Sequence, residues 1–492
     1  MSWHLAIDLG AGSGRAMLAR VCPDELRLEE VHRFRYAPRR VAGRLRWDIE
    51  RLFEGVRTGV IAAGERTAGF DAHVGSVGVD SWGVDYGLLD QAGRLVEEPI
   101  CYRDERTDGV MDDVFASVPR DEIFARTGIQ FHQLNTLYQL VAHVRDGVPS
   151  HASRLLLMPG LCHHLLCGAQ VAERTDASTT QLVNIGTGQW DADLFGRLGL
   201  PLDLMPPLVS TGTDLGPLRS GLSGGRGLDG TRVIAPPTHD TASAVAGTPL
   251  EPGWAYISSG TWSLVGIERI GPILNDDASL ANFTNEAGAF GTVRFLKNVM
   301  GLWLLESCRR EWDAAGSPAD LESLISRVAA VGRFAGLVYP DDQRFFNPPS
   351  MVRALGEALA ETGQEALEDP VLLTRVIVDS LALRYASVIE RIEQITGESI
   401  RGIHVVGGGS LNECLNQATA DATGRPVVAG PIEATAIGNI LVQAVATLTL
   451  PSLAHGRELV RRTQAPRRFE PSASRAWSEA ACRYQDLEAG AR

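Results

Sequence analysis

The segment Pro237–Val245 contains the residues best suited to chemistry. It reads Pro-Thr-His-Asp-Thr-Ala-Ser-Ala-Val, so Asp240 follows a strand ended by proline and stands at the expected N-terminus of a helix of small residues. A carboxylate there can accept the proton of an attacking hydroxyl, which is the main protein group that phosphoryl transfer needs. His239 and Thr241 could orient that hydroxyl. The alternative is that Asp240 only caps the helix.

A glycine-rich turn follows the first strand-like stretch of the chain. Asp8 lies near the end of an apolar run, the turn Gly10–Arg15 comes next, and a second strand-like stretch begins at once. Glycines let backbone N–H groups close around phosphate oxygens, and Ser13 and Arg15 add donors. Asp8 is placed to hold a metal-bound water near such phosphates. A tight hairpin turn without a ligand is the alternative.

A third motif, Asp80-Ser-Trp-Gly-Val-Asp85, ends an apolar strand. Sugars are bound by an aromatic plane and by carboxylates that bridge hydroxyls, and Trp82, Gly83 and Asp85 fit that description. The alternative is that Trp82 belongs to the core.

The second half of the chain holds two more glycine turns. Ser258-Ser-Gly-Thr261 resembles a hydroxyl-bearing hairpin turn, in which we expect Thr261 to be exposed. Val405–Ser410 contains three consecutive glycines and is expected to open a helix, which favours an anion or a nucleotide. Asn298 follows the expected strand Thr292–Leu296 and could reach substrate hydroxyls. Plain loop geometry is the alternative for both turns.

The elements that must position these residues follow from periodicity. In the first half we expect strands at 4–9, 15–21, 26–35, 74–80 and 232–235, a helix at 48–66, and 84–89 as a hairpin partner or continuation of 74–80. In the second half we expect strands at 254–259, 262–267, 403–406 and 426–429 and helices at 300–314, 370–396, 412–422 and 434–448. The strand–turn–strand order thus occurs in both halves, which predicts two similar α/β lobes.

Composition limits the class of protein. The 492 residues are 44% hydrophobic and 22% charged with a net charge of −14, which is typical of a globular protein and argues against nucleic-acid or anionic-membrane partners. We expect no membrane span, because no apolar run approaches the roughly 20 residues required. Seven scattered cysteines favour a reducing, cytoplasmic location.

These motifs together resemble the FGGY carbohydrate kinases over nearly the whole chain. The segments that carry the resemblance are Asp8–Arg15, Asp80–Asp85, Cys101–Arg106, Asn135–Gln139, Thr179–Asn184, His239–Val245, Ser258–Leu264, Lys297–Leu304, Val405–Ser410 and Gly430–Ala436. The resemblance implies an α/β fold of two actin-like, ribonuclease H-type domains with a nucleotide- and sugar-binding cleft between them. It also implies ATP, Mg²⁺ and a ketose, with L-rhamnulose, phosphorylated on its 1-hydroxyl, favoured within the family.

The resemblance also implies roles for individual residues. ATP contacts are expected from Ala11, Gly12, Ser13, Gly14, Arg15, Thr261, Glu306 and Gly408, although Glu306 stands where the family carries a glutamine. Sugar contacts are expected from Trp82, Gly83, Asp85, His239, Asp240, Thr241 and Asn298, with Asp240 as the proton acceptor and Asp8 holding Mg²⁺ through water. The expected domains are 1–246, 247–455 and a polar C-terminal segment, 456–492, in a monomer or homodimer.

Three alternatives follow from the same residues. Another ketose of the family, such as L-fuculose, L-xylulose or ribulose, could replace L-rhamnulose. A Rossmann oxidoreductase would explain Gly10–Gly14, but its fingerprint needs glycine where Arg15 stands and a helix next. A non-catalytic actin-like sugar-sensing protein would keep both glycine turns but would not need Asp240.

Overall fold

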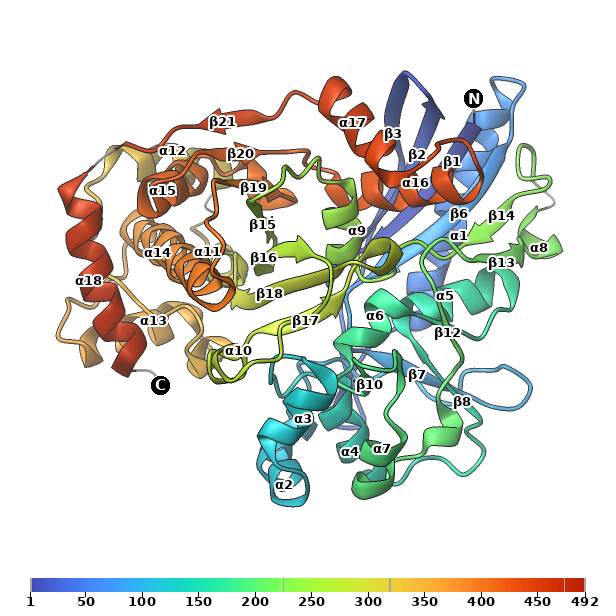
Figure 1. Cartoon of the computed structure of the whole chain (residues 1–492), viewed down its shortest axis with the longest axis horizontal. Coiled ribbons are helices and arrows are strands. Elements are labelled where there is room, and N and C mark those ends of the chain that lie inside the picture. Colours follow the sequence, from blue (N-terminus) through green and yellow to red (C-terminus); the bar gives the residue numbers. More distant parts are fainter. Residues whose placement is uncertain (1, 224, 318–319, 473, 491–492) are drawn as a thin grey trace. The chain divides into compact units, whose positions relative to one another are not determined.

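The computed structural model describes residues 2–223, 225–317, 320–472 and 474–490 (Figure 1). The chain divides into two compact units, each assembled from separate stretches. Unit 1 comprises Met1–Pro249, Glu268–Phe295 and Ala434–Thr463, and unit 2 comprises Leu250–Ile267, Leu296–Glu433 and Gln464–Arg492. The contiguous boundaries expected from sequence, near residues 246 and 455, stay a prediction.

Unit 1 is built on a sheet with the strand order β13-β14-β6-β1-β2-β3. Its strands are β1 (Ser2–Leu9), β2 (Ser13–Cys22), β3 (Glu25–Arg35), β6 (Val74–Ser81), β13 (Asp214–Pro217) and β14 (Arg232–Ile234). The first three strands pair antiparallel, whereas β1, β6 and β14 run parallel to one another. The three antiparallel strands and the strand at 74–80 expected from sequence are therefore confirmed.

Helices cover both faces of this sheet. Gly59 of α1 (Ile49–Ala68) lies against Ile7 and Ala16 on one face. On the other face, α16 (Ala434–Ala446) packs Ile437 and Ile440 into a cluster that includes Ala6. The consecutive residues Ala6 and Ile7 of β1 thus face α16 and α1 respectively, because successive side chains of a strand point to opposite faces of the sheet.

Helix α9 (Asp240–Gly247) packs backbone to backbone on α16. A Cβ on Gly438 would overlap the carbonyl oxygen of Ser243, and a Cβ on Gly247 would overlap that of Ala434. The two glycines therefore fix how closely the helix that begins at Asp240 lies against α16.

The remaining elements of unit 1 surround the strand ends. They are β4 (Arg39–Val41), β5 (Arg44–Arg46), β7 (Tyr86–Leu89), α2 (Val110–Ser117), α3 (Arg120–Thr127), α4 (Thr136–Asp146), β8 (Arg154–Leu157), α5 (Met158–Cys167), β9 (Ala172–Glu173), α6 (Arg174–Thr179), β10 (Val183–Asn184), β11 (Gln189–Trp190), α7 (Ala192–Leu198), β12 (Leu208–Val209), α8 (Ser220–Ser223), α10 (Asp276–Leu280), β17 (Thr284–Ala287) and α17 (Leu453–Thr463). The pairing expected for 84–89 is wrong, because β7 pairs antiparallel with β8 rather than with β6.

Unit 2 repeats the plan of unit 1. Its elements are β15 (Trp254–Ser259), β16 (Trp262–Arg269), the end of β18 (Val293–Met300), α11 (Trp303–Ala314), α12 (Leu321–Ala330), α13 (Met351–Glu361), α14 (Pro370–Thr396), β19 (Gly402–Val406), α15 (Glu413–Thr423), β20 (Val427–Ala429), β21 (Arg467–Phe469) and α18 (Arg475–Gly490). β15 pairs antiparallel with β16 and parallel with β19, as β1 pairs with β2 and β6. The structural repeat expected from sequence is present in this topology.

One local expectation for the second half is wrong. Asn298 lies inside β18 rather than after the strand, because backbone pairing continues past the apolar residues. The polar C-terminal segment contributes to the fold, since β21 pairs with β20 and α18 buries Trp477, Ala480 and Tyr484.

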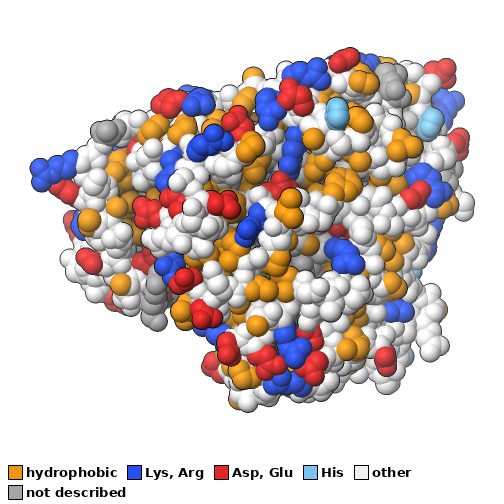
Figure 2. Space-filling view, viewed as in Figure 1, with side chains coloured by type: hydrophobic (Ala, Val, Ile, Leu, Met, Phe, Trp, Pro, Cys, Tyr) orange, Lys and Arg blue, Asp and Glu red, His pale blue; other side chains and the backbone are white. Residues whose placement is uncertain are grey.

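The surface shown in Figure 2 alternates acidic and basic side chains with apolar ones. This mixture is typical of a globular protein surface, and the acidic side chains outnumber the basic ones in a chain of net charge −14. Among the described residues, no helix combines the length and the apolar character needed to cross a membrane.

Candidate functional site

Three acidic residues of unit 1 meet at one edge of its sheet. β1, β6 and β14 run parallel, so their carboxyl ends share this edge. Asp8 and Asp80 are register partners on β1 and β6. The chain after β14 reaches the same edge, because the Ser81 N–H donates to the Thr238 carbonyl at 2.9 Å. Asp240 begins α9, as its sequence position predicted, and the fold places it near Asp8 and Asp80.

The loop that carries Asp240 is fixed by Glu173, which is buried. Its Oε2 accepts hydrogen bonds from the Thr238 N–H at 3.0 Å and the Thr238 hydroxyl at 3.0 Å. The same oxygen accepts from the Thr175 N–H at 3.0 Å, and Thr175 Oγ1 in turn accepts from the His239 N–H at 3.2 Å. One carboxylate thus connects α6 to the loop before Asp240.

Asp240 is available for chemistry. Its side chain is 29% exposed, and Oδ1 accepts a hydrogen bond from the Thr241 hydroxyl at 3.1 Å. His239, not Asp240, occupies the N-cap position of α9, and it makes no capping hydrogen bond. Loss of solvation raises the pKa of Asp240; His239 opposes this shift and the neighbouring Asp8 adds to it. A raised pKa makes the carboxylate a better proton acceptor.

Two of the neighbouring acids are bound by donors. Asp85 Oδ2 accepts from the indole N–H groups of Trp47 at 2.7 Å and Trp82 at 3.0 Å, and Oδ1 accepts from Gln139 at 3.1 Å. Burial still raises the pKa of Asp85 to about 6. Asp80 accepts one hydrogen bond, from Asn439 of α16 at 2.5 Å, and burial raises its pKa well above the usual range.

Asp176, in the first turn of α6, differs from these acids. It is only 1% exposed, and neither carboxylate oxygen has a hydrogen-bond partner among the described residues. Burial raises the pKa of Asp176 well above its usual value, and the surrounding acids Glu173, Asp240, Asp85 and Glu286 raise it further. The direction of this shift favours the protonated, neutral form of Asp176 in the folded protein.

The sugar motif expected at residues 80–85 lies deeper than an open binding face. Trp82 is 7% exposed, and its ring packs against Trp47 with centroids 4.5 Å apart. A Cβ on Gly83 would lie 2.9 Å from Thr179 Oγ1 and 3.3 Å from Asp176 Oδ1. Trp82 and Asp85 thus support the position of Gly83, and an exposed aromatic plane at Trp82 is absent.

The N-terminal turn is a closed hairpin. The Gly10 N–H donates to the Ser13 carbonyl at 2.9 Å, and Arg15 donates to Asp8 Oδ2 at 2.6 Å. Gly14 is required by packing, because a Cβ there would overlap the ring of Phe34. Gly12 is exposed, its φ is not in the left-handed region, and a Cβ would meet nothing within 4 Å. Nothing in the described chain requires glycine at this position.

The triple-glycine turn of unit 2 also contains both glycines that packing requires and a glycine that it does not. Gly407 and Gly409 lie against Ser259 of β15, where a Cβ on Gly409 would overlap the Ser259 side chain. Gly408 is exposed and its Cβ would again meet nothing within 4 Å. A 3₁₀ turn, Gly408–Leu411, joins this turn to α15, which begins at Glu413 with Asn412 as its N-cap, within one residue of the helix expected at 412–422.

Gly408 and Glu306 line a cavity of about 1180 Å³ within unit 2. Its wall combines leucines of α11 with several arginines, and Glu306 itself pairs with Arg309 at 2.9 Å. The lining residues are Leu302, Leu305, Glu306, Arg309, Asp320, Leu321, Glu322, Ile325, Ser326, Ala329, Val331, Arg333, Arg375, Gly408, Leu411, Asn412, Glu413, Cys414, Gln417, Arg467, Arg468 and Phe469. An apolar wall beside cationic groups suits a flat, anionic ligand such as a nucleotide.

Thr261 is exposed, as expected from sequence. Its carbonyl accepts hydrogen bonds from the Gly301 N–H at 3.2 Å and the Trp303 N–H at 3.1 Å, which hold the turn against the start of α11. Asn298 of β18 is half-buried in the same unit. The expected site residues are thus divided between the two units: those up to Thr241 lie in unit 1, and Thr261, Asn298, Glu306 and Gly408 lie in unit 2.

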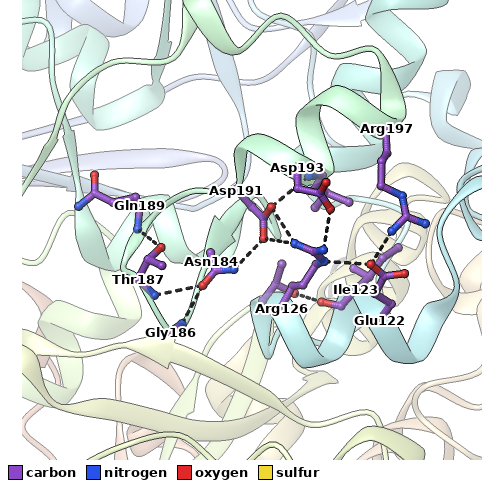
Figure 3. A network of polar contacts seen from close by, with 12 residues as sticks. Glu122, Ile123, Arg126, Asn184, Gly186, Thr187, Gln189, Asp191, Asp193 and Arg197 are labelled. Atoms are coloured by element: carbon purple, nitrogen blue, oxygen red, sulfur yellow. Dashed lines mark hydrogen bonds and ion pairs between the residues drawn. The ribbon is translucent and has the colours of Figure 1, made fainter.

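Asp191 shows how another buried carboxylate is stabilised in unit 1 (Figure 3). It accepts hydrogen bonds from the Leu194 N–H at 3.0 Å, from Asn184 at 2.8 Å and from Arg126 at 3.2 Å. Burial alone would raise the pKa of Asp191, but these donors outweigh it and lower the pKa. Asp191 and Asp176 are therefore buried aspartates whose pKa values are shifted in opposite directions.

Sequence reasoning missed Glu173, Asp176, Glu286 and Arg294. Glu173 and Asp176 precede a threonine-rich stretch that was noted only for its resemblance. Arg294 and Glu286 contact His239, but they stand about 50 residues away in the chain with no local signal of that contact. A charged residue inside an otherwise apolar strand, such as Arg294 in β18, is the one feature that could have drawn attention.

Comparison with known proteins agrees with this geometry. The chain matches the model of the FGGY family of carbohydrate kinases, N-terminal domain, over residues 3–247. It matches the C-terminal domain of the same family over residues 255–447.

Curated relatives and solved structures extend the match to nearly the full length. The chain is 39% identical over 484 residues to a rhamnulokinase of Bacteroides thetaiotaomicron, covering 98% of both chains. It is 42% identical over 490 residues to one of Pectobacterium carotovorum, covering 98% of this chain and 96% of the relative. A ligand-bound xylulose kinase of Lactobacillus acidophilus, 15% identical, has a TM-score of 0.78 over 99% of this chain and 96% of its own. A glycerol kinase of Plasmodium falciparum, solved with ADP and 14% identical, has a TM-score of 0.77 over 100% and 98%. These structures show the shared two-domain fold.

The contrast between Asp176 and Asp191 generates a prediction about stability. The folded-state pKa of Asp176 is raised above the ordinary 3.8, so the folded protein keeps a proton that the unfolded chain releases. The stabilisation that Asp176 gives to the folded protein is therefore complete below pH 3.8. As pH rises above that value, the free energy of unfolding falls by up to about 1.4 kcal/mol per pH unit. We expect Asp176→Asn to remove this loss, so the Tm difference between variant and wild type should grow in favour of the variant from pH 5 to pH 8, as measured by calorimetry.

Asp191→Asn is the matched control. The pKa of Asp191 is lowered, so its stabilisation is present above the unfolded pKa and is lost as pH falls. This variant should be less stable than wild type at pH 7, with a smaller deficit at low pH. A Tm difference for Asp176→Asn that stays constant or shrinks from pH 5 to pH 8 would contradict a neutral Asp176.

Proposed function

Because the chain belongs to the FGGY family of carbohydrate kinases, we propose that it transfers the γ-phosphate of ATP to the 1-hydroxyl of L-rhamnulose. The relatives named rhamnulokinase, at 38–42% identity over almost the full chain, support this substrate. The observation that carries the proposal within the molecule is Asp240. It is a carboxylate of raised pKa whose side chain is 29% exposed, whereas the neighbouring Asp80, Asp85 and Asp176 are buried.

Asp240 accepts the proton of the sugar hydroxyl in this proposal. The hydroxyl oxygen attacks the γ-phosphorus, a new O–P bond forms, and the bond to the bridging β,γ-oxygen breaks with release of ADP. Little covalent work is required of the protein, so positioning of the hydroxyl matters most. His239, Thr241 and the backbone at Gly83 provide that positioning.

In this proposal ATP binds at the two glycines that packing does not require, Gly12 and Gly408. Gly12 in unit 1 offers backbone N–H groups to phosphate, and Gly408 in unit 2 lines the cavity that accepts the nucleotide. Thr261 adds a hydroxyl donor. Glu306 lies at the cavity wall and is negatively charged, so it repels the phosphates of the nucleotide. It contacts the uncharged base or ribose instead, or acts through its ion-pair partner Arg309.

Asp8 at the sheet edge is the residue that would hold Mg²⁺, through a water molecule. Its Oδ2 accepts from Arg15, and carboxylate oxygen is the ligand type that Mg²⁺ prefers. Such an ion would neutralise charge on the transferred phosphate.

We also place the reaction in the cytoplasm, where ATP is present and thiols stay reduced. All seven cysteines are free, and those at 101, 162 and 308 are buried. The protein acts as a monomer or a homodimer in this proposal.

A panel of ketoses tests the substrate. We expect the highest kcat/KM for L-rhamnulose, measured by coupled release of ADP, with L-fuculose, L-xylulose and D-ribulose as competitors. A clearly higher kcat/KM for one of these sugars would refute the substrate while leaving the kinase activity intact.

Asp240→Asn tests the proton acceptor. We expect kcat to fall by about 10²–10⁴-fold, because asparagine cannot take the hydroxyl proton. ATP affinity and Tm should change little, since asparagine preserves the shape and His239 holds the N-cap position. Kinetics and calorimetry on the same preparation measure both. Turnover near that of wild type in the folded variant would remove Asp240 from the chemistry.

Gly12→Ala and Gly408→Ala test the two open glycines. A Cβ at either position meets nothing within 4 Å, so we expect no loss of stability. The free energy of unfolding should stay equal or increase by up to about 1 kcal/mol, and Tm should follow it. The KM for ATP should rise by about tenfold, since the added methyl group occupies the approach of the ligand to the backbone. Gly409→Ala is the control, and it should lower Tm because its Cβ overlaps the Ser259 side chain. Unchanged KM for ATP in both open-glycine variants would show that ATP does not approach these positions.

A further inference from the structure

Two side chains that can act as a base lie next to each other in unit 1. His239 Nε2 faces Asp240 Oδ1 at 3.6 Å, and either group has the chemistry to accept the hydroxyl proton. Which of them does so depends on where the imidazole already carries its own proton. The groups around the other ring nitrogen, Nδ1, decide this.

Nδ1 of His239 lies against Arg294. The Arg294 side chain is fully buried, and its Nη2 is 3.0 Å from Nδ1. Nε of the same guanidinium donates to the Ala287 carbonyl at 3.1 Å, which fixes the plane of the group. Glu286 balances the charge, with Oε2 3.0 Å from Arg294 Nη2.

A guanidinium only donates hydrogen bonds and stays protonated in proteins. The hydrogen bond at 3.0 Å therefore requires Nδ1 of His239 to be the acceptor, without a proton of its own. In the neutral imidazole the remaining proton is then on Nε2, the nitrogen that faces Asp240.

The competing arrangement places a proton on Nδ1 and directs it to Glu286. That contact is longer, at 3.4 Å, and it would bring an N–H against the guanidinium at 3.0 Å. Glu286 Oε2 also lies 3.0 Å from Arg294, so its charge is already balanced. The shorter contact and the repulsion between two donors both favour Nδ1 as the acceptor.

We propose that Arg294 is a positioning residue that holds His239 as the neutral Nε2–H tautomer and so assigns the role of proton acceptor to Asp240. The proposal rests on the phosphoryl transfer described above. With Nε2 protonated, His239 presents a donor toward Asp240 and toward an entering hydroxyl oxygen. The hydroxyl is then oriented with its own hydrogen toward the carboxylate, and His239 does not compete for it.

The tautomer can be measured in the unaltered protein. Histidine labelled with ¹⁵N distinguishes a protonated ring nitrogen from an unprotonated one by long-range ¹H–¹⁵N correlation, and His239→Gln identifies the signal. We expect His239 to show a protonated Nε2 and an unprotonated Nδ1 at pH 7.5. A protonated Nδ1, in either the other tautomer or the imidazolium, would overturn the proposal.

Two variants test the role of Arg294. In Arg294→Met, Nδ1 loses its donor and Glu286 loses its counter-ion, so the ring proton should move to Nδ1 and kcat should fall by about tenfold or more, with KM for ATP within about twofold of wild type. Arg294→Lys keeps one donor and a positive charge, and it should restore the Nε2–H signal and part of kcat. A wild-type His239 spectrum in folded Arg294→Met, or no spectral recovery in folded Arg294→Lys, would overturn the role of Arg294.

Arg384→Met is the matched control. Arg384 is equally buried and pairs with Asp341 at 2.7 Å and Glu488 at 2.8 Å, but all three residues belong to unit 2. It should lower Tm through its buried, unpaired acids and leave the His239 spectrum unchanged. The proposal and the proposed function fail separately: the ring spectrum reports the tautomer, whereas Asp240→Asn and the ketose panel report the reaction.

Discussion

The burial of several carboxyl groups at one sheet edge is the constraint on which the rest of unit 1 depends. A buried carboxylate costs several kcal/mol unless donors solvate it, a cation pairs with it, or a proton neutralises it. Unit 1 uses all three solutions, and the acids concerned are Asp8, Asp80, Asp85, Glu173, Asp176, Asp240 and Glu286. Asp8 and Glu286 have arginine partners, and Glu173 and Asp85 have several donors. Asp176 has no donor among the described residues, and burial raises its pKa toward the protonated form. Asp240 alone of this set combines an exposed fraction near one third with a raised pKa, which is the state suited to accepting and releasing a proton.

Each of the two glycine turns contains a glycine that packing requires and one that it does not. Gly14 and Gly409 are fixed by neighbours, Phe34 and Ser259, and any side chain there would collide with the folded chain itself. Gly12 and Gly408 have no such neighbour and no left-handed φ, so folding alone does not explain them. Because packing does not require glycine at these two positions, a side chain placed there would affect a ligand that approaches the backbone rather than the folded chain itself. This distinction needs coordinates, because all four residues look alike in the sequence.

Short-range patterns predicted most elements, and long-range contacts account for what they missed. Alternation and turn residues located β1, β2, β3, β6 and α14 to within about two residues. Asn298 was placed after its strand because polarity was read as the end of pairing, whereas backbone hydrogen bonds do not depend on side-chain polarity. Trp82 was expected to be an open plane, yet Trp47, 35 residues earlier, covers its ring. Asp240 was found from local sequence, but Asp8, which adds to the upward shift of its pKa, and Arg294, which contacts the adjacent His239, come near it only through the fold.

The repeated topology shows why the two units carry different chemistry. Asp8 stands two residues before Gly10 and pairs in register with Asp80; the equivalent residue of unit 2, Ser258, stands two residues before Gly260 and pairs with Val406. The same backbone plan therefore presents two acids in unit 1 and a hydroxyl beside an apolar side chain in unit 2. Charge at these strand ends therefore differs between the units, because single side chains set the charge whereas the backbone sets the topology. One architecture can thus present different chemistry at corresponding strand ends without any change in strand order.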